Sequence, residues 1–287
     1  MDEDAGSMQR IFKSGAGAIV TKSISLKSRE GYPNPAVIEL EHGILNAMGL
    51  PNPGIDAFSE EILKLKSSKI PIIGSIFGAN ANEFVKLAKK MQSYGVDAVE
   101  LNLSCPHAKG YGLELGSDPL LVKNITKGVK KNTNMPLFVK ISPNLPSVSE
   151  IAKAAESAGA DAIVAINTVK AMKIDLELQM PVLSNKIGGY SGKAVKPIGI
   201  RCVYEIAKDV DIPVIGVGGI TTGKDAIEYF MAGASAVQIG SAIYYRELDV
   251  FEKICKEIKD WMEEHNYKNI SELIGVAQRW IIQKLQR

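Results

Sequence analysis

Cysteine is scarce in this chain of 287 residues, and the three that occur form no C-x-x-C pair. Cys105, Cys202 and Cys255 are far apart in the sequence, which argues against a disulfide framework, a zinc ribbon or an iron–sulfur cluster bound by this chain. We therefore predict no metal site, and we expect a reduced, cytoplasmic setting.

Long apolar runs and an excess of one charge are also lacking. No apolar run approaches the ~20 residues of a membrane-spanning helix, and the start MDEDAGSMQR lacks the basic and apolar regions of a signal peptide. The formal net charge is only +2, with Lys and Arg scattered among Asp and Glu. Neither a membrane nor a nucleic acid is therefore an expected partner.

What the chain does have is apolar mass and a regular alternation. Hydrophobic residues make up 46% of it, enough for a large core. Short apolar runs alternate with amphipathic segments, which predicts βα units around a parallel sheet. The runs are residues 18–23, 71–78, 98–105, 136–143, 162–169, 213–220 and 236–244.

Polar residues and glycines gather where these runs end, and the carboxyl ends of the strands are the active-site face of a (β/α)8 (TIM) barrel. A doubly wound sheet would need a Gly-rich turn after its first strand, which is absent. We predict a single barrel domain over residues 1–287. Only seven strands can be counted, and seven would leave two unpaired edges, so we expect the first barrel strand to be missing upstream of this sequence.

Two segments are too long for simple βα loops. Residues 29–54 are predicted to form a small β-hairpin over the mouth of the barrel, and residues 169–199 form a second insertion. Long structured loops on this face usually serve binding.

Glycines and small hydroxyl residues end the last two strands, in GVGGI (residues 216–220) and IGSAI (residues 239–243). Free backbone N–H groups at a helix N-terminus can hold a phosphate, and the GGYSG of the second insertion could add contacts. Glycines at strand ends also serve turn geometry alone, but the presence of both loops favours a phosphate site.

Two lysines, Lys22 and Lys140, are flanked by apolar strand residues and are predicted to face the mouth. There they would stabilise negative charge on a ligand, although a lysine that merely extends to solvent, or one that forms a Schiff base, is an alternative. Asn46, Asn102 and Asn167, with Thr168, supply donors and acceptors that suit a pyrimidine or flavin edge. Considered singly, each asparagine would more often cap a turn or a strand end, but together they favour a ligand site.

Cys105 ends the run 98–105 and precedes a Pro and a glycine-rich stretch. Three interpretations are open for it: a buried filler, part of a metal site, or a catalytic thiolate acting as nucleophile or base. Its place at the end of a barrel strand favours the last. Cys202 and Cys255 are interpreted as small buried apolar residues.

Seven motifs in this order resemble the dihydroorotate dehydrogenase family: GAIVTKS, ILNAMGLPNPG, ELNLSCP, FVKISPN, AINTV, GGYSGKAVKPIGIR and GVGGITTGKDAIEYFMAGASAVQIGSAIY. The resemblance implies an FMN-binding barrel that oxidises (S)-dihydroorotate to orotate in pyrimidine biosynthesis. The cysteine implies class 1, and NAMGLPNPG with SGKAVKPIGIR is most similar to the class 1B catalytic subunit.

The same resemblance implies roles for individual residues, with Cys105 removing the C5 proton. Substrate contacts are implied for Lys22, Asn46, Ala47, Met48, Gly49, Leu50, Asn102, Asn167 and Thr168. FMN contacts are implied for Lys22, Ser23, Asn102, Lys140, Ile166, Gly192, Gly218, Gly219, Gly240 and Ser241.

Because this chain has no iron–sulfur cysteines, an NAD-linked enzyme would need a partner subunit that carries FAD and a 2Fe–2S cluster. The resemblance implies a homodimer, or a heterotetramer with that subunit. The chain departs from the family at His107 and Ser75, where Asn is usual or frequent. Alternatives are a flavoenzyme that reduces uracil or thymine, an FMN- or phosphate-binding barrel without turnover, and an aldolase using Lys140.

Overall fold

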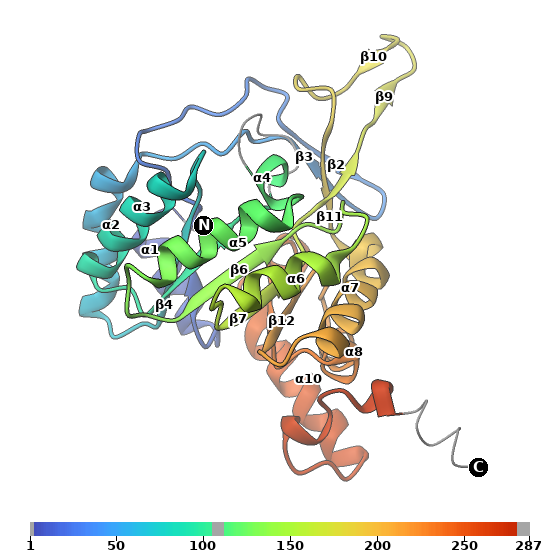
Figure 1. Ribbon diagram of the computed structural model, residues 1–287. Coiled ribbons are helices and arrows are strands. Elements are labelled where there is room, and N and C mark those ends of the chain that lie inside the picture. The colour runs from blue at the N-terminus through green and yellow to red at the C-terminus, as the bar shows by residue number, and fades with distance from the viewer. Residues whose placement is uncertain (1–2, 105–111, 280–287) are drawn as a thin grey trace.

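A curled parallel sheet forms the centre of the molecule. The computed structural model describes residues 3–104 and 112–279 (Figure 1). The strands are adjacent in the order β1-β4-β5-β6-β7-β12-β13. Their bounds are β1 (Ile19–Val20), β4 (Ile72–Ile76), β5 (Ala98–Asn102), β6 (Leu137–Ile141), β7 (Ala162–Ala165), β12 (Val214–Val217) and β13 (Ala236–Gln238). They are the seven predicted strands, and within the described residues no further strand joins β13 to β1.

Helices follow the strands and cover the outside of the sheet (Figure 1). The sequence sets their ends: the Asn80 side chain accepts the Glu83 N–H at the start of α3, and Gly95, with φ of 85°, ends that helix. The helices are α1 (Ala5–Lys13), α2 (Ile55–Ser67), α3 (Ala81–Tyr94), α4 (Leu113–Gly116), α5 (Pro119–Lys130), α6 (Val148–Ser157), α7 (Lys196–Asp209), α8 (Gly223–Ala232), α9 (Ala242–Arg246) and α10 (Val250–Glu264), with short 3-10 turns η1 (Lys193–Val195) and η2 (Ile270–Glu272).

Alternation along each strand separates the apolar core from a polar interior. On β5, Val99 and Leu101 belong to the main apolar core, whereas Glu100 bonds to Gln238. Gln238 Nε2 donates to Glu100 Oε2 at 3.0 Å, although β5 and β13 are not neighbours in the sheet. This bond therefore spans the inside of the curl, as expected for the predicted TIM-barrel class.

The two insertions form one antiparallel sheet over the barrel. β2 (Val37–Leu40) and β3 (Gly43–Asn46) make the predicted hairpin, and β11 (Gly188–Ser191) pairs with β3 on one side and β8 (Val169–Ala171) on the other. The sequence did not predict that the insertions would pair. β9 (Ile174–Asp175) and β10 (Met180–Pro181) extend away from the body as an arm (Figure 1).

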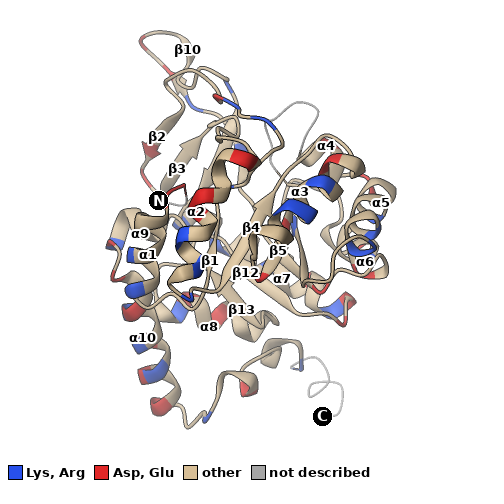
Figure 2. Ribbon diagram, turned by 90° about the vertical axis from the view of Figure 1, so that its left-hand side faces the viewer, with Lys and Arg blue, Asp and Glu red and all other residues tan. Residues whose placement is uncertain are grey.

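Charged residues of both signs are interspersed on the surface, for example on α2 and α10 (Figure 2). Among the described residues, no helix combines the length and apolarity that a membrane crossing requires.

The loop between β12 and α8 is held by one carboxylate. Asp225 accepts the backbone N–H groups of Thr221 at 2.9 Å and Thr222 at 2.8 Å, and Lys196 Nζ donates to it at 2.8 Å. Burial by itself would raise the pKa of Asp225, but the hydrogen bonds from Lys196, Thr221 and Thr222 outweigh burial and lower the pKa to about 2. The ionised carboxylate therefore stabilises this loop.

We expect Asp225→Asn to lower the free energy of unfolding by about 2 kcal/mol at pH 7, the equivalent of a pKa lowered from 3.8 to about 2. Because the folded state lowers the pKa, this stabilisation is complete above about pH 5 and is lost as the pH falls through 3.8 towards 2. Urea unfolding of the wild type and of Asp225→Asn across this pH range measures the difference in the free energy of unfolding. Asp209→Asn, which removes a surface pair with Lys153, is the control and should change stability much less. A difference between wild type and Asp225→Asn that does not narrow with falling pH would contradict the assignment.

Candidate active site at the carboxyl ends of the strands

A continuous hydrogen-bonded network joins the predicted polar residues at the ends of β1, β4 and β5. Asn102 Nδ2 donates to Ser23 Oγ at 2.9 Å, and the Ser23 and Ser75 hydroxyls are 2.8 Å apart. Asn102 is only 7% exposed and Ser75 only 2%. Parallel strands bring their carboxyl ends to one rim, so residues more than fifty positions apart meet there. Ser75, a departure from the family pattern, is thus part of this network.

Ser104 links two of the asparagines. It is fully buried; its Oγ donates to Asn102 Oδ1 at 2.9 Å and accepts from Asn167 Nδ2 at 2.8 Å. Thr168 N–H donates to Asn167 Oδ1 at 2.8 Å. These bonds fix the orientation of both amides and use one N–H of each Nδ2, which leaves one N–H on each for a ligand carbonyl. Sequence reasoning missed Ser104, whose only signal was its position between Asn102 and Cys105.

The insertion sheet brings Asn46 and Thr168 to the same place. Gly189 of β11 lies opposite Asn46 of β3, and Asn46 Nδ2 donates to the Gly189 carbonyl at 3.3 Å. A Cβ on Gly189 would lie 2.0 Å from Thr168 Oγ1, so only glycine fits there. Asn144 donates from Nδ2 to the Thr168 carbonyl at 2.9 Å and was not singled out from the sequence.

The loop after β3 presents backbone rather than side chains. Ala47 is fully buried, Met48 is 39% exposed, and Gly49 and Leu50 have φ of 76° and 59°. Arg29 Nε donates to the Gly49 carbonyl at 2.6 Å, which anchors the loop. Within the described part of the chain, no group accepts from the N–H groups of Met48, Gly49 or Leu50. Three such donors in sequence suit a carboxylate.

Each predicted lysine has an acidic partner. Lys140 Nζ lies 3.7 Å from Glu100 Oε1, and Lys22 Nζ donates to Glu3 Oε1 at 2.8 Å. Both side chains are 18% exposed, so neither simply extends into solvent. The acidic partners were not predicted from the sequence.

Three of the predicted phosphate-binding glycines adopt backbone conformations that favour glycine. Gly192, Gly218 and Gly219 have φ of 104°, 130° and 67°. A Cβ on Gly219 would lie 2.7 Å from the Gly192 carbonyl oxygen, so the two loops are in close contact, whereas a Cβ on Gly240 would meet nothing within 4 Å. Ser241 directly precedes α9. Bare backbone beside open space fits a phosphate-bearing cofactor such as FMN.

Two further residues, Tyr229 and Ile166, contact Gly218 of the predicted phosphate-binding segment. The Tyr229 hydroxyl donates to the Gly218 carbonyl at 2.7 Å, and burial raises the pKa of this tyrosine far above its usual range. Ile166, only 2% exposed, lies beside Gly218, since a Cβ on that glycine would be 3.5 Å from Ile166 Cγ1. Tyr229 was missed in the sequence because a buried tyrosine on a helix carries no distinct signal.

The predictions for the three cysteines differ in how they compare with the structure. Cys105 and His107 lie outside the described residues. Cys202 is buried as predicted, and burial raises the pKa of its thiol to about 11, which makes it unreactive at neutral pH. The interpretation of Cys255 as buried was wrong: it lies on the exposed side of the amphipathic α10. The described residues contain no group of three or more potential metal-ligating side chains.

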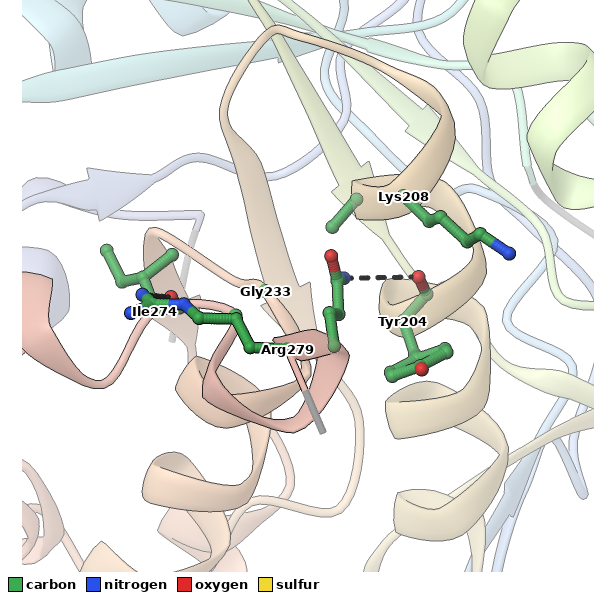
Figure 3. A pocket seen from close by; sticks show the side chains of 8 residues that line it. Tyr204, Lys208, Gly233, Ile274 and Arg279 are labelled. Carbon is green, nitrogen blue, oxygen red and sulfur yellow. Dashed lines mark hydrogen bonds between the residues drawn. The ribbon is translucent and has the colours of Figure 1, made fainter. Parts of the chain in front are cut away.

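A separate cavity of about 540 Å³ lies between α7 and the C-terminal segment (Figure 3). Gln278 extends from the C-terminal segment and donates from Nε2 to the Tyr204 carbonyl of α7 at 3.4 Å. Gly233, which also lines the cavity, precedes β13, so the cavity adjoins the amino ends of the strands. None of the predicted site residues lines it.

Replacing Ser104 tests whether the network holds the amides. Ser104→Ala would leave Asn102 Oδ1 and Asn167 Nδ2 short of a buried partner, and we expect a loss of about 1–3 kcal/mol in the free energy of unfolding. Thr126→Val is a matched control, because Thr126 Oγ1 is buried without a partner among the described residues; this change should be neutral or stabilising. Denaturant unfolding measures both, and equal effects would show that Ser104 does not act through its hydrogen bonds.

Comparisons with known proteins agree with this arrangement. A family profile described as "Dihydroorotate dehydrogenase" matches residues 1–262. The chain is similar to proteins named "Dihydroorotate dehydrogenase B (NAD(+)), catalytic subunit". It is 53% identical to that of Thermoplasma volcanium over 96% of this chain and 91% of the relative. It is 51% identical to that of Methanocaldococcus jannaschii over 96% of this chain and 91% of the relative. It is 52% identical to that of Pyrococcus furiosus over 95% of this chain and 90% of the relative.

A solved structure shows the same fold. The dihydroorotate dehydrogenase of Eimeria tenella, determined in complex with ferulenol, superposes with a TM-score of 0.83 at 23% identity, covering 97% of this chain and 83% of the other. The likeness confirms the predicted TIM-barrel class. With a family profile over residues 1–262 and relatives at about half identity, the chain belongs to the dihydroorotate dehydrogenase family and is most similar to its class 1B catalytic subunits.

Proposed function

We infer that this chain is an oxidoreductase that converts (S)-dihydroorotate to orotate in pyrimidine biosynthesis. Family membership supports the reaction. The observation that carries the proposal for the site is the pair of amides, Asn102 and Asn167, that Ser104 fixes directly before Cys105 in the chain.

The substrate contacts follow from the donors that the network leaves free. Asn102 and Asn167 each offer one N–H to a ring carbonyl. Asn46 approaches from the insertion sheet, and Thr168 from the segment between β7 and β8. The loop from Ala47 to Leu50, with the N–H groups of Met48, Gly49 and Leu50, receives the carboxylate that distinguishes dihydroorotate from uncharged pyrimidines.

Cys105 is the proposed base. The C5–H of dihydroorotate is acidified by the adjacent ring carbonyl, so a thiolate is basic enough to remove the proton. The asparagine amides, which Ser104 Oγ keeps in position, hold the ring while this proton moves to the Cys105 sulfur. Lys22, paired with Glu3, adds positive charge near the substrate.

FMN is the proposed cofactor, and when bound it supplies the acceptor at N5 for the hydride that leaves C6. Gly192, Gly218, Gly219, Gly240 and Ser241 would hold FMN, largely its phosphate; the close contact between Gly192 and Gly219 supports a shared role for their two loops. Lys140 would stabilise negative charge at the N1–O2 edge, with Lys22, Ser23, Asn102 and Ile166 as further contacts. The positive φ values of three of these glycines support this assignment.

Electrons then pass to another protein. We propose a homodimer that joins a partner subunit carrying FAD and a 2Fe–2S cluster, because relatives are named as NAD-linked catalytic subunits and this chain has only three scattered cysteines. The arm of β9 and β10 exposes large apolar side chains, which is typical of contacts between chains. They are Ile174, Leu176, Leu178 and Met180, between 52% and 82% exposed. The cysteine pattern also supports a reduced, cytoplasmic location.

An anaerobic absorbance spectrum tests the proposal directly. Purified protein should be yellow, and dihydroorotate should bleach the flavin bands in the absence of oxygen. Cys105→Ser is the matched variant: it should retain FMN but be reduced slower by orders of magnitude at neutral pH, because an alcohol is a far weaker base than a thiolate. Protein that stays oxidised with dihydroorotate would instead indicate another pyrimidine substrate or a barrel without turnover.

Replacing Asn46 distinguishes orotate from uncharged pyrimidines. Asn46 is the last residue of β3 and sets where the carboxylate-binding loop begins. We expect Asn46→Ala to weaken orotate binding at least tenfold more than uracil binding, since only orotate carries the carboxylate, with roughly 1.4 kcal/mol for each factor of ten. Titration of the flavin spectrum with both ligands measures this ratio, and equal losses would favour the uracil- or thymine-reducing alternative.

A further inference from the structure

A carboxylate is buried inside the barrel beneath the candidate site. Glu100 of β5 is 1% exposed. Its Oε2 accepts from Gln238 at 3.0 Å, and its Oε1 lies 3.7 Å from Lys140 Nζ. Burial of a carboxylate is costly, and a well-packed apolar side chain at such a position often gives equal or greater stability. Structural need alone therefore does not explain the charge.

Glu100 lies behind Lys140 as seen from the mouth of the barrel. Asn102, two residues further along β5, stands opposite Lys140 in the sheet register and belongs to the network of the rim. At about 3.3 Å of rise per residue, Glu100 is roughly 7 Å deeper than Asn102. Its distance from Lys140 exceeds that of a hydrogen bond, so the ammonium keeps its donors available for a ligand above.

We propose that Glu100 is a positioning and tuning residue: it anchors Lys140 from below and lowers the reduction potential of FMN bound above it. This inference rests on the proposed function for the location of the flavin. A lysine ammonium beside the flavin favours the reduced, negatively charged form, and a fixed negative charge behind that ammonium opposes the effect. Inside the barrel little water screens charges, so the negative charge of Glu100 weakens the stabilisation of reduced flavin by Lys140.

Because Gln238 donates to Glu100, two substitutions can distinguish the effect of the Glu100 charge from the effect of its contact across the barrel. Glu100→Gln removes the charge but keeps an oxygen that can accept from Gln238, so the contact across the barrel is preserved. Gln238→Met removes that contact and keeps the charge. A purely structural role for Glu100 predicts that Gln238→Met has the larger effect on every property.

The experiment is an anaerobic redox titration of the FMN-bound proteins against a dye of known potential, which requires no dihydroorotate. At the potential where the wild type is half reduced, we expect the ratio of reduced to oxidised flavin in Glu100→Gln to rise about tenfold, equivalent to ~30 mV for a two-electron couple. In Gln238→Met the ratio should stay within twofold while the melting temperature falls. A ratio in Glu100→Gln that falls or stays within twofold, or an equal shift in both variants, overturns the proposal.

A second readout needs no flavin. In protein stripped of FMN, the rate at which acetic anhydride modifies Lys140, measured by peptide mass spectrometry relative to the exposed Lys259, should rise severalfold when Glu100 is replaced, because the ammonium loses its counter-ion. An unchanged rate overturns the pairing. Glu100→Met provides a second neutral side chain of similar length if Glu100→Gln does not fold. If the protein fails to bind FMN or to oxidise dihydroorotate, the proposed function fails, yet the labelling result still tests Glu100.

Discussion

The parallel pairing of the strands is the constraint on which the rest of the structure depends. Because all seven strands point the same way, the residues that end them meet at one rim, however far apart they lie in the sequence. Ser23, Ser75, Asn102 and Asn167 come from four different strands or their ends, yet with Ser104 they form one hydrogen-bonded chain. The same pairing places Lys140 opposite Asn102 and leaves Glu100 one layer further inside.

Much of this architecture could be predicted from the sequence, because it follows from local patterns. The alternation of apolar runs with amphipathic segments located all seven strands. The polar residues after each run identified the functional rim. The insertion hairpin at residues 29–54 was also predicted, since a turn between two short strands is a local feature.

What the sequence did not reveal depends on contacts between distant segments. The pairing of β11 with β3 joins residues about 145 positions apart, and no local pattern indicates such a partner. Ser104, Asn144 and Tyr229 act through bonds to groups that only the fold brings near. The acidic partners of Lys22 and Lys140 were likewise unpredicted, and Cys255 was misassigned because one cysteine on an amphipathic helix does not reveal which side it occupies.

The insertion sheet couples the registers of β3 and β11, two strands from distant parts of the sequence. β3 and β11 are in register, with Asn46 opposite Gly189 and Ile44 opposite Ser191. In a strand, a shift of one residue turns every side chain to the other face. Deleting one residue within β3 or β11 would therefore turn Asn46 away from the mouth or place a side chain where only Gly189 fits against Thr168. Changes in length are expected to be tolerated outside the paired strands, for example in the arm of β9 and β10.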